Sequence, residues 1–148
     1  TIKFSSDFII GHPGETEEDF NDTINFLSKI KFINSYSFIY SSRPGTPASN
    51  LDLIDYEVAK ERLIKIQEIL FRYQLEHNES FLGKKIEVLV ENKMKKSQMY
   101  FGRNEYLSGV IFEGNERFVG KTVKIKINKV NQNNLFGTID TNSDMRAA

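Results

Sequence analysis

The sequence predicts an α/β region followed by an all-β region, with a long helix connecting them. Three observations lead to this fold class. A strand, a helix and a second strand follow one another near the start, apolar residues at helical spacing occupy the middle, and short runs of period-two alternation fill the rest. We predict an α/β domain at 1–54, a connecting helix at 55–82, a β-barrel at 83–140 and a polar tail at 141–148.

The composition is that of a globular protein. The chain has 148 residues, of which 39% are hydrophobic and 12% aromatic, enough for a core. No run approaches the roughly 18 apolar residues that span a bilayer, so we expect a cytoplasmic protein without a membrane partner. The absence of cysteine excludes disulfides and iron–sulfur or zinc-thiolate sites in this chain.

The net charge of zero hides an uneven distribution. Residues 1–82 contain 8 lysines and arginines against 13 acids, whereas residues 83–140 contain 11 against 6. This asymmetry indicates two modules, the second of which would face a polyanion. Alternatively, the lysines merely solvate the outer face of a short sheet.

The first strand and helix are predicted from a short apolar run and a capping sequence. Residues 8–10 are apolar and precede a Gly-His-Pro-Gly turn, as in a buried strand that enters a tight turn. Thr16 would cap a helix over 16–31, with Asp19 completing a variant of the capping box. The apolar face of this helix would comprise Phe20, Ile24, Leu27 and Ile30.

A second strand follows at 36–40, where aromatic and mainly small residues alternate. Strand, helix and strand form a βαβ unit with parallel strands, whose carboxyl ends collect functional groups. The loop 41–48 holds two prolines, a glycine and Arg43, so a stiff turn would present one guanidinium to a carboxylate or phosphate. The alternative is a rigid turn whose arginine pairs with a nearby acid.

The remaining elements are a long helix and five strands. The helix would run from Asp55 to about Leu82 and end at Gly83. Alternation predicts strands that would close a small five-stranded antiparallel barrel. These strands lie at 85–91, 99–103, 109–112, 123–128 and 135–139.

The sequences DFIIGHPGET at 7–16 and YSFIYSSRPGTPA at 36–48 together resemble the late strands of the barrel of radical S-adenosylmethionine tRNA methylthiotransferases. The resemblance implies the carboxyl-terminal part of that barrel. It also implies that Ile9 contacts the adenosyl part of the cofactor, that Gly11 lies in the turn, and that Arg43 lines the same face. His12 and Ser42 stand where the family commonly has phenylalanine and proline.

The second half, with Gly102-Arg103-Asn104, Gly120-Lys121 and Leu135-Phe136-Gly137, resembles the TRAM domain, an OB-like RNA-binding barrel that ends these enzymes. The resemblance implies tRNA, through its anticodon stem-loop, as the partner. Tyr100 and Phe101 alternate to opposite faces of a strand, so at most one of them would stack on a base, and Tyr106 in the connecting loop is the better candidate. The expected RNA contacts are Lys84, Lys85, Arg103, Tyr106, Lys124 and Lys126.

By this resemblance the chain is part of a transferase that adds a methylthio group to position 2 of isopentenyl-modified adenosine next to the anticodon. The family uses S-adenosylmethionine and two 4Fe–4S clusters held by cysteines, including a CxxxCxxC segment, and this chain has no cysteine. We therefore expect no catalytic or metal-binding residue here, no activity of the chain alone, and an amino-terminal part of the enzyme as its partner. The alternatives are a non-enzymatic RNA-binding remnant of a split or truncated gene, and the related threonylcarbamoyladenosine methylthiotransferase.

Overall fold

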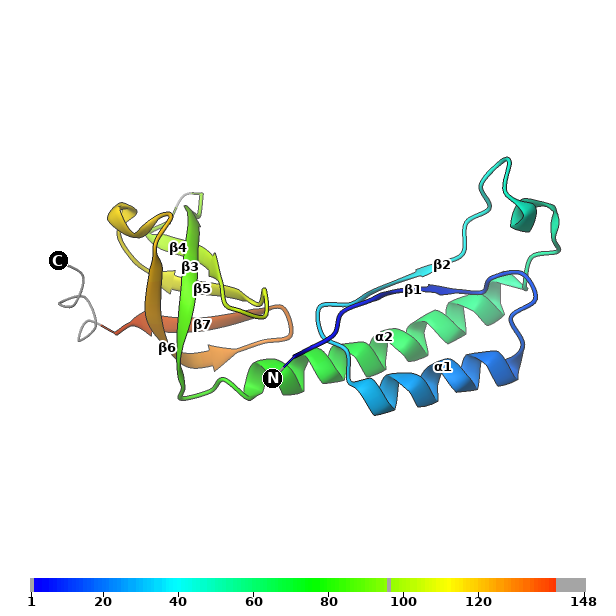
Figure 1. The fold of residues 1–148 in the computed structure, drawn as a ribbon, viewed down its shortest axis with the longest axis horizontal. Helices are drawn as coiled ribbons and strands as arrows, with labels where there is room; N and C mark the ends of the chain where they lie inside the picture. Colours follow the sequence, from blue (N-terminus) through cyan, green and yellow to red (C-terminus); the bar gives the residue numbers. More distant parts are fainter. Residues whose placement is uncertain (1, 96, 141–148) are drawn as a thin grey trace. The chain divides into compact units, whose positions relative to one another are not determined.

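The computed structural model describes residues 2–95 and 97–140. The chain divides into two compact units, Thr1–Tyr73 and Gln74–Ala148, and the division falls inside helix α2 (Tyr56–Glu79). Figure 1 shows helices beside a pair of strands in the first unit and a barrel in the second. No helix among the described residues is long and apolar enough to cross a membrane.

The first unit is built on a parallel strand pair, as the sequence predicts. Strand β1 (Asp7–Ile10) pairs with β2 (Tyr36–Ile39) so that Ile9 stands opposite Phe38. Helix α1 (Glu17–Ile30) lies between the two strands in the sequence, and a short 3-10 helix, η1 (Pro47–Asn50), follows β2. The βαβ interpretation is therefore confirmed.

The amino-terminal cap of α1 also agrees with the prediction. Thr16 Oγ1 accepts the Asp19 N–H at 3.1 Å, and Asp19 Oδ2 accepts the Thr16 N–H at 2.9 Å, so both halves of a capping box form. These bonds from the Thr16 backbone and hydroxyl lower the pKa of the Asp19 carboxyl. Lys31 ends the helix in the left-handed conformation, and its N–H donates to Leu27 O.

Only one face of the two-stranded sheet is covered by the described residues. Ile10 packs with Phe20 and Leu27 of α1 and with apolar residues of α2. The prediction that 8–10 is a buried strand is wrong for Ile9, whose side chain is 60% exposed on the opposite face. Phe38, its partner across the sheet, is 54% exposed. Ile30, predicted on the packing face of α1, is also not buried and is 37% exposed.

Helix α2 begins where predicted and ends earlier. Asp55 Oδ1 accepts the N–H groups of Glu57 and Val58, which satisfies two donors of the first turn. The helix ends at Glu79 rather than near Leu82, and its 24 residues correspond to about 36 Å. Turns occupy the residues up to Gly83, which has a positive φ of 75°.

The second unit is a closed five-stranded barrel in the order β3-β4-β5-β7-β6. The prediction of an antiparallel barrel is wrong for one pair, because β5 and β7 are parallel. Five strands cannot close a ring with every neighbour reversed, since an odd number of reversals does not restore the starting direction. The strands are β3 (Lys85–Lys93), β4 (Met99–Arg103), β5 (Gly109–Glu113), β6 (Thr122–Val130) and β7 (Asn134–Ile139).

Alternation along the strands fills the barrel with apolar side chains. On β6, Val123, Ile125 and Ile127 point inward and are buried, while the lysines between them are exposed. A short 3-10 helix, η2 (Glu116–Phe118), adds Phe118 to this core. Because the core is complete within the second unit, the outward positions of its strands are available for binding.

Candidate functional site

The turn after β1 is the first candidate site. Gly11 has a φ of 74°, and a Cβ at this position would lie 2.8 Å from Cβ of Ala59. Both the backbone conformation and the packing against α2 therefore require glycine, independently of any ligand. The Gly11 N–H donates to Glu15 Oε2 at 3.1 Å, which fixes the turn on itself.

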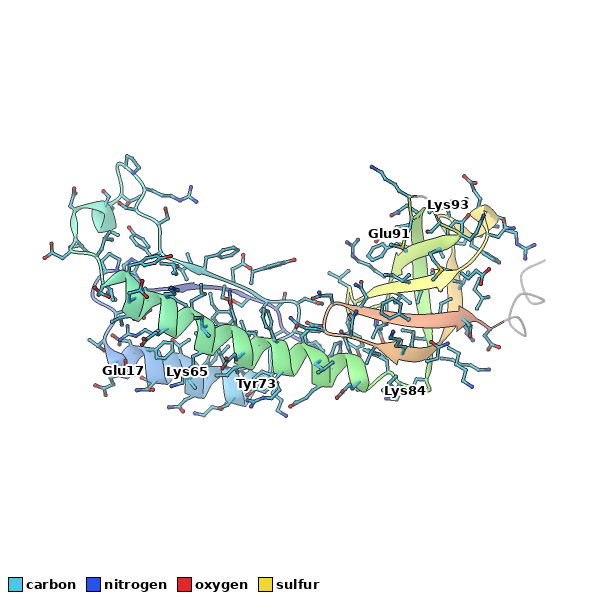
Figure 2. The ribbon with its side chains drawn as sticks, turned by 180° about the vertical axis from the view of Figure 1, so that it is seen from behind. Glu17, Lys65, Tyr73, Lys84, Glu91 and Lys93 are labelled. Atoms are coloured by element: carbon cyan, nitrogen blue, oxygen red, sulfur yellow. The ribbon has the colours of Figure 1, made fainter. Side chains whose placement is uncertain are left out.

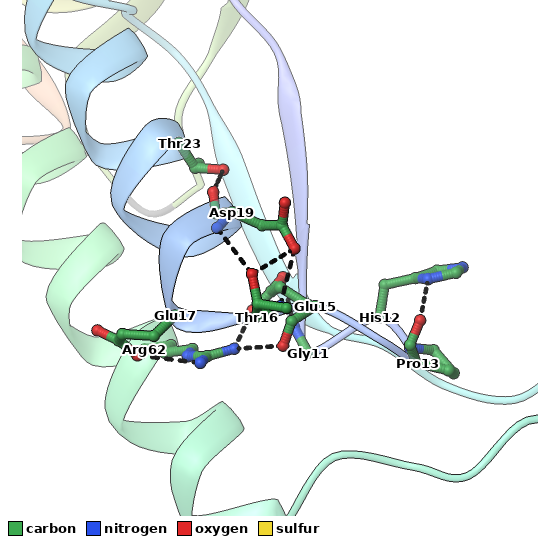
Figure 3. A network of polar contacts seen from close by, with 9 residues as sticks. All are labelled: Gly11, His12, Pro13, Glu15, Thr16, Glu17, Asp19, Thr23 and Arg62. Carbon is green, nitrogen blue, oxygen red and sulfur yellow. Dashed lines mark hydrogen bonds and ion pairs between the residues drawn. The ribbon is translucent and has the colours of Figure 1, made fainter.

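Arg62 of α2 binds the residues that follow this turn, Glu15 and Glu17 (Figure 3). Its Nη1 donates to Glu15 Oε1 at 2.7 Å and to the Glu15 carbonyl at 3.1 Å, and its Nη2 donates to Glu17 Oε2 at 3.0 Å. Burial of the guanidinium opposes its charge, but the bonds to Glu15 and Glu17 outweigh it and raise the pKa of Arg62. Glu15 thereby links Arg62 to the Gly11 backbone.

The sequence interpretation missed Arg62. A signal is present, because Arg62 stands three residues after Ala59 and four before Ile66, and both of these are buried. An arginine on the apolar face of a helix indicates a buried acidic partner. Charge counts along the chain do not reveal which acid that is.

The structure places the three predicted cofactor residues in different settings. Ile9 lies on the open face of the sheet, Gly11 in the turn after β1, and Arg43 in the exposed loop after β2. Ile9 and Gly11 stand at the carboxyl end of one strand, and the Arg43 loop follows the carboxyl end of its parallel neighbour. His12 contacts the edge of Tyr40 at 5.1 Å between ring centroids.

The second candidate site is the outside of the barrel. Lys124 and Lys126 occupy consecutive outward positions of β6, and Lys126 pairs in register with Lys85 of β3. Lys85 Nζ forms an ion pair with Asp140 at 2.7 Å, and Lys124 and Lys126 are exposed. Lys84 precedes β3 at the end of the strand opposite from Glu91 and Lys93 (Figure 2).

Arg103 ends β4 and faces outward. Its Nη1 lies 2.6 and 2.7 Å from the two carboxylate oxygens of Glu91 on the neighbouring strand. Its guanidinium also lies 5.2 Å from the ring centroid of Phe101, in cation–π geometry. Arg103 and Lys85 both line a hollow of about 430 Å³, whose lining also includes exposed Leu89 and the acids Glu87 and Glu105.

Tyr106 is less accessible than its predicted role suggests. Its ring is half-buried against the barrel core and meets the edge of His77 at 5.3 Å between centroids, with Phe81 at 6.1 Å. The predicted alternation on β4 is confirmed, because Tyr100 is 3% exposed and Phe101 points outward. Phe101 is therefore the more accessible aromatic side chain of β4.

Within the described ranges 2–95 and 97–140, no group of three or more histidine, cysteine, aspartate or glutamate side chains is arranged to hold a metal ion. The chemistry that these residues offer is recognition through cations, aromatic rings and an open apolar sheet face.

Comparisons with known proteins identify relatives of the chain. Residues 79–139 match the TRAM domain. The chain is 52% identical to a Pelagibacter ubique protein over 99% of the chain and 33% of that protein. It is 45% identical to a Buchnera aphidicola protein over 93% of the chain and 32% of that protein. It is 44% identical to an Acetivibrio thermocellus protein over 93% of the chain and 29% of that protein.

All three relatives are named tRNA-2-methylthio-N(6)-dimethylallyladenosine synthase, and the chain spans about a third of their length. Their similarity extends over both units, whereas the TRAM match falls in the barrel and the residues just before it. The chain therefore contains a TRAM domain and is, over nearly its whole length, a homologue of part of these synthases.

Proposed function

We propose that the chain is the carboxyl-terminal part of a cytoplasmic tRNA methylthiotransferase that adds a methylthio group to position 2 of isopentenyl-modified adenosine next to the anticodon. The names of the relatives support this substrate over the threonylcarbamoyl-modified one. In this proposal the barrel binds the anticodon stem-loop of tRNA, and the first unit contributes part of the cofactor pocket.

The observation that carries the RNA-binding role is the position of the lysines on the barrel. Lys124 and Lys126 alternate with buried core residues, and Lys85 lies beside Lys126 on the next strand. The fold thus directs these cations outward on a surface of two adjacent strands, as phosphate binding requires. Lys84, Arg103 and Tyr106 complete the proposed contact set.

For the cofactor, the open sheet face of the first unit supplies a suitable wall. Ile9 and the exposed aromatic rings of Tyr36 and Phe38 offer apolar surface for an adenosyl group, and Arg43 offers a cation for the carboxylate of S-adenosylmethionine. The iron–sulfur clusters do not fit this chain, because no cysteine is present to ligate them. In the proposed enzyme, their ligands and the amino-terminal part that carries them lie outside this chain.

The RNA-binding role is tested by fluorescence anisotropy of the 148-residue chain with a labelled anticodon stem-loop at several salt concentrations. We expect log affinity to fall with log salt by about 0.7 per phosphate contact. The double variant Lys124→Gln/Lys126→Gln should flatten this slope by up to two contacts, or about 1.4. The control Lys60→Gln/Lys65→Gln, on α2, should leave it unchanged. Absence of binding by the unmodified chain at low salt would exclude the proposal.

The cofactor role requires the proposed full-length enzyme. Gly11→Val is a poor test, since the fold itself requires glycine at that position. Ile9→Ser changes an exposed side chain and should weaken S-adenosylmethionine binding in calorimetry without lowering the melting temperature. Equal affinity of the two proteins would remove Ile9 from the pocket.

A further inference from the structure

Three apolar side chains form a row across the outside of the barrel. Phe101 of β4 pairs in register with Ile111 of β5, and Ile111 pairs with Phe136 of β7. All three are only partly buried, although the side chains of Tyr100, Val110, Phe112 and Leu135 beside them point into the core. We propose that this row, named here the outer apolar row, is a stacking platform for unpaired bases of RNA. The inference deepens the proposed RNA-binding function and depends on it.

The backbone beneath the row is shaped to hold Phe101. A Cβ placed on Gly109 would lie 2.9 Å from Cε2 of Phe101, so the phenyl ring rests over the glycine backbone. The same Cβ would lie 2.8 Å from Oδ1 of Asn134 on β7. Glycine at 109 therefore leaves room for a fixed aromatic ring on the barrel surface. A ring held in this way loses little rotamer freedom when a base stacks on it.

A cation lies over each aromatic ring of the row. The Arg103 guanidinium lies 5.2 Å from the Phe101 centroid, and Lys129 Nζ lies 5.7 Å from the Phe136 centroid. A base that stacks on either of these ring faces must displace the cation from it, and the displaced cation can then bind the phosphate of that nucleotide. This pairing of aromatic surface with cations is typical of single-strand binding by OB-type barrels.

Two acidic side chains near the row affect how a phosphate would bind there. Glu91 already binds Arg103 through both carboxylate oxygens, and Glu113 lies two residues beyond Ile111 on the same face of β5. A phosphate at Arg103 must therefore compete with Glu91. The arginine is 45% exposed in its side chain, so the exchange requires no opening of the core.

The charges favour RNA over an apolar protein partner. A protein surface that covered the row would bury Arg103 and Lys129 against apolar groups, at a cost in desolvation. A nucleotide instead offers an apolar base for the rings and an anion for each cation. Duplex RNA offers no free base face, so the platform is specific for single-stranded segments.

The test uses the 148-residue chain and RNA containing 2-aminopurine, an adenine analogue whose fluorescence is quenched by stacking. Single-stranded oligo(A) carrying the analogue should be quenched on binding. Phe101→Leu and Phe136→Leu should each reduce the quenching and weaken binding by about 5- to 150-fold while leaving the salt slope unchanged. Leucine keeps the apolar packing, and near-ultraviolet circular dichroism checks that the barrel is folded.

Two further variants sharpen the test. Val119→Ala removes an exposed apolar side chain of the second unit outside the row and should have no effect. Glu91→Gln releases Arg103 and should tighten binding by about two- to fivefold. Phenylalanine variants that bind oligo(A) and quench its fluorescence as well as the unmodified chain does would exclude the outer apolar row as a stacking platform. That result would leave the proposed phosphate contacts of the lysines unaffected. If the unmodified chain binds neither oligo(A) nor the stem-loop at low salt, both proposals fail.

Discussion

The two units of this chain differ in whether their sheets have free edges. In the barrel every strand has two hydrogen-bonded neighbours, and the ring of five strands has no free edge. The first unit has two parallel strands with helices against one face, so Ile9 and Phe38 are exposed on the other. A closed sheet separates core from surface within its own residues, whereas an open one leaves part of its apolar surface exposed.

This difference bears on function. On the barrel, outward positions carry lysines and the outer apolar row, and none of these side chains is needed to complete the core. In the first unit, Ile9 and Phe38 of the exposed apolar face lie near the carboxyl ends of the parallel strands, and ligands bind beyond these ends in such sheets. The barrel is thus suited to bind along its outside, and the first unit through its open face.

The largest predicted effect compares isoleucines from the two units. Ile127→Ala removes a fully buried side chain of β6 and should lower the free energy of unfolding of the barrel by about 2–5 kcal/mol. Ile9→Ala truncates an exposed side chain and should change stability by no more than about 0.5 kcal/mol. Urea unfolding followed by amide NMR signals of each unit measures both changes.

The same spectra contain the control. Signals of the first unit should keep their unfolding midpoint in Ile127→Ala, since that residue belongs to the barrel core. Equal losses of stability from the two substitutions would contradict the contrast between a closed and an open sheet. Such a result would mean that the Ile9 face is covered in solution.

Local patterns in the sequence predict the elements well and their surroundings less well. Period-two alternation identified each barrel strand, and the Thr16 to Asp19 spacing identified the capping box, because both depend on neighbours within a few residues. The parallel β5 and β7 pair depends on the closure of the whole ring. Alternation within one strand contains no information about the direction of its neighbour.

The candidate sites show the same limit. Arg62 lies 47 residues from Glu15, and nothing in either local sequence links the two. Tyr106 lies in the loop between β4 and β5, where the sequence predicts an accessible ring, but the ring packs against Phe81 and His77. Phe101 was assigned to the face opposite Tyr100 by alternation, yet only the structure shows that it faces outward.

A prediction of intermediate size compares two paired arginines. Arg62→Met removes a guanidinium whose side chain is 9% exposed and leaves Glu15 without its partner, so we expect a loss of about 1–3 kcal/mol in the first unit. Arg103→Met breaks a pair that is 45% exposed at the arginine and 32% at Glu91, and should cost less than about 1 kcal/mol. Thermal unfolding of both variants gives the comparison.

These substitutions should separate stability from binding. Arg103→Met should weaken RNA binding in the salt titration, whereas Arg62→Met should not. Similar destabilisation by both would indicate that the Arg103 pair contributes more than solvent-exposed pairs usually do. Glu17→Gln, which removes the exposed acid at Arg62, should have a smaller effect than Arg62→Met.

The smallest effect concerns pH and the capping box of α1. The pKa of Asp19 is lowered because its carboxylate accepts the Thr16 backbone N–H and hydroxyl, so the carboxylate form stabilises the folded helix end. This contribution is fully present above the ordinary pKa of 3.8 and is lost as the pH falls through the lower folded value. The protection of the amides in the first turn of α1, measured from their exchange rates corrected for the intrinsic effect of pH, should therefore decrease on acidification below about pH 4.

Asp19→Asn provides the matched control, since an amide oxygen can still accept a hydrogen bond but does not titrate. In this variant the exchange rates of the first turn, corrected for the intrinsic effect of pH, should lose the dependence that is due to residue 19. The barrel amides of β6 serve as an internal reference, because they belong to the other unit. If the first turn of α1 responds to acid equally with aspartate and with asparagine, the capping box does not cause the acid sensitivity.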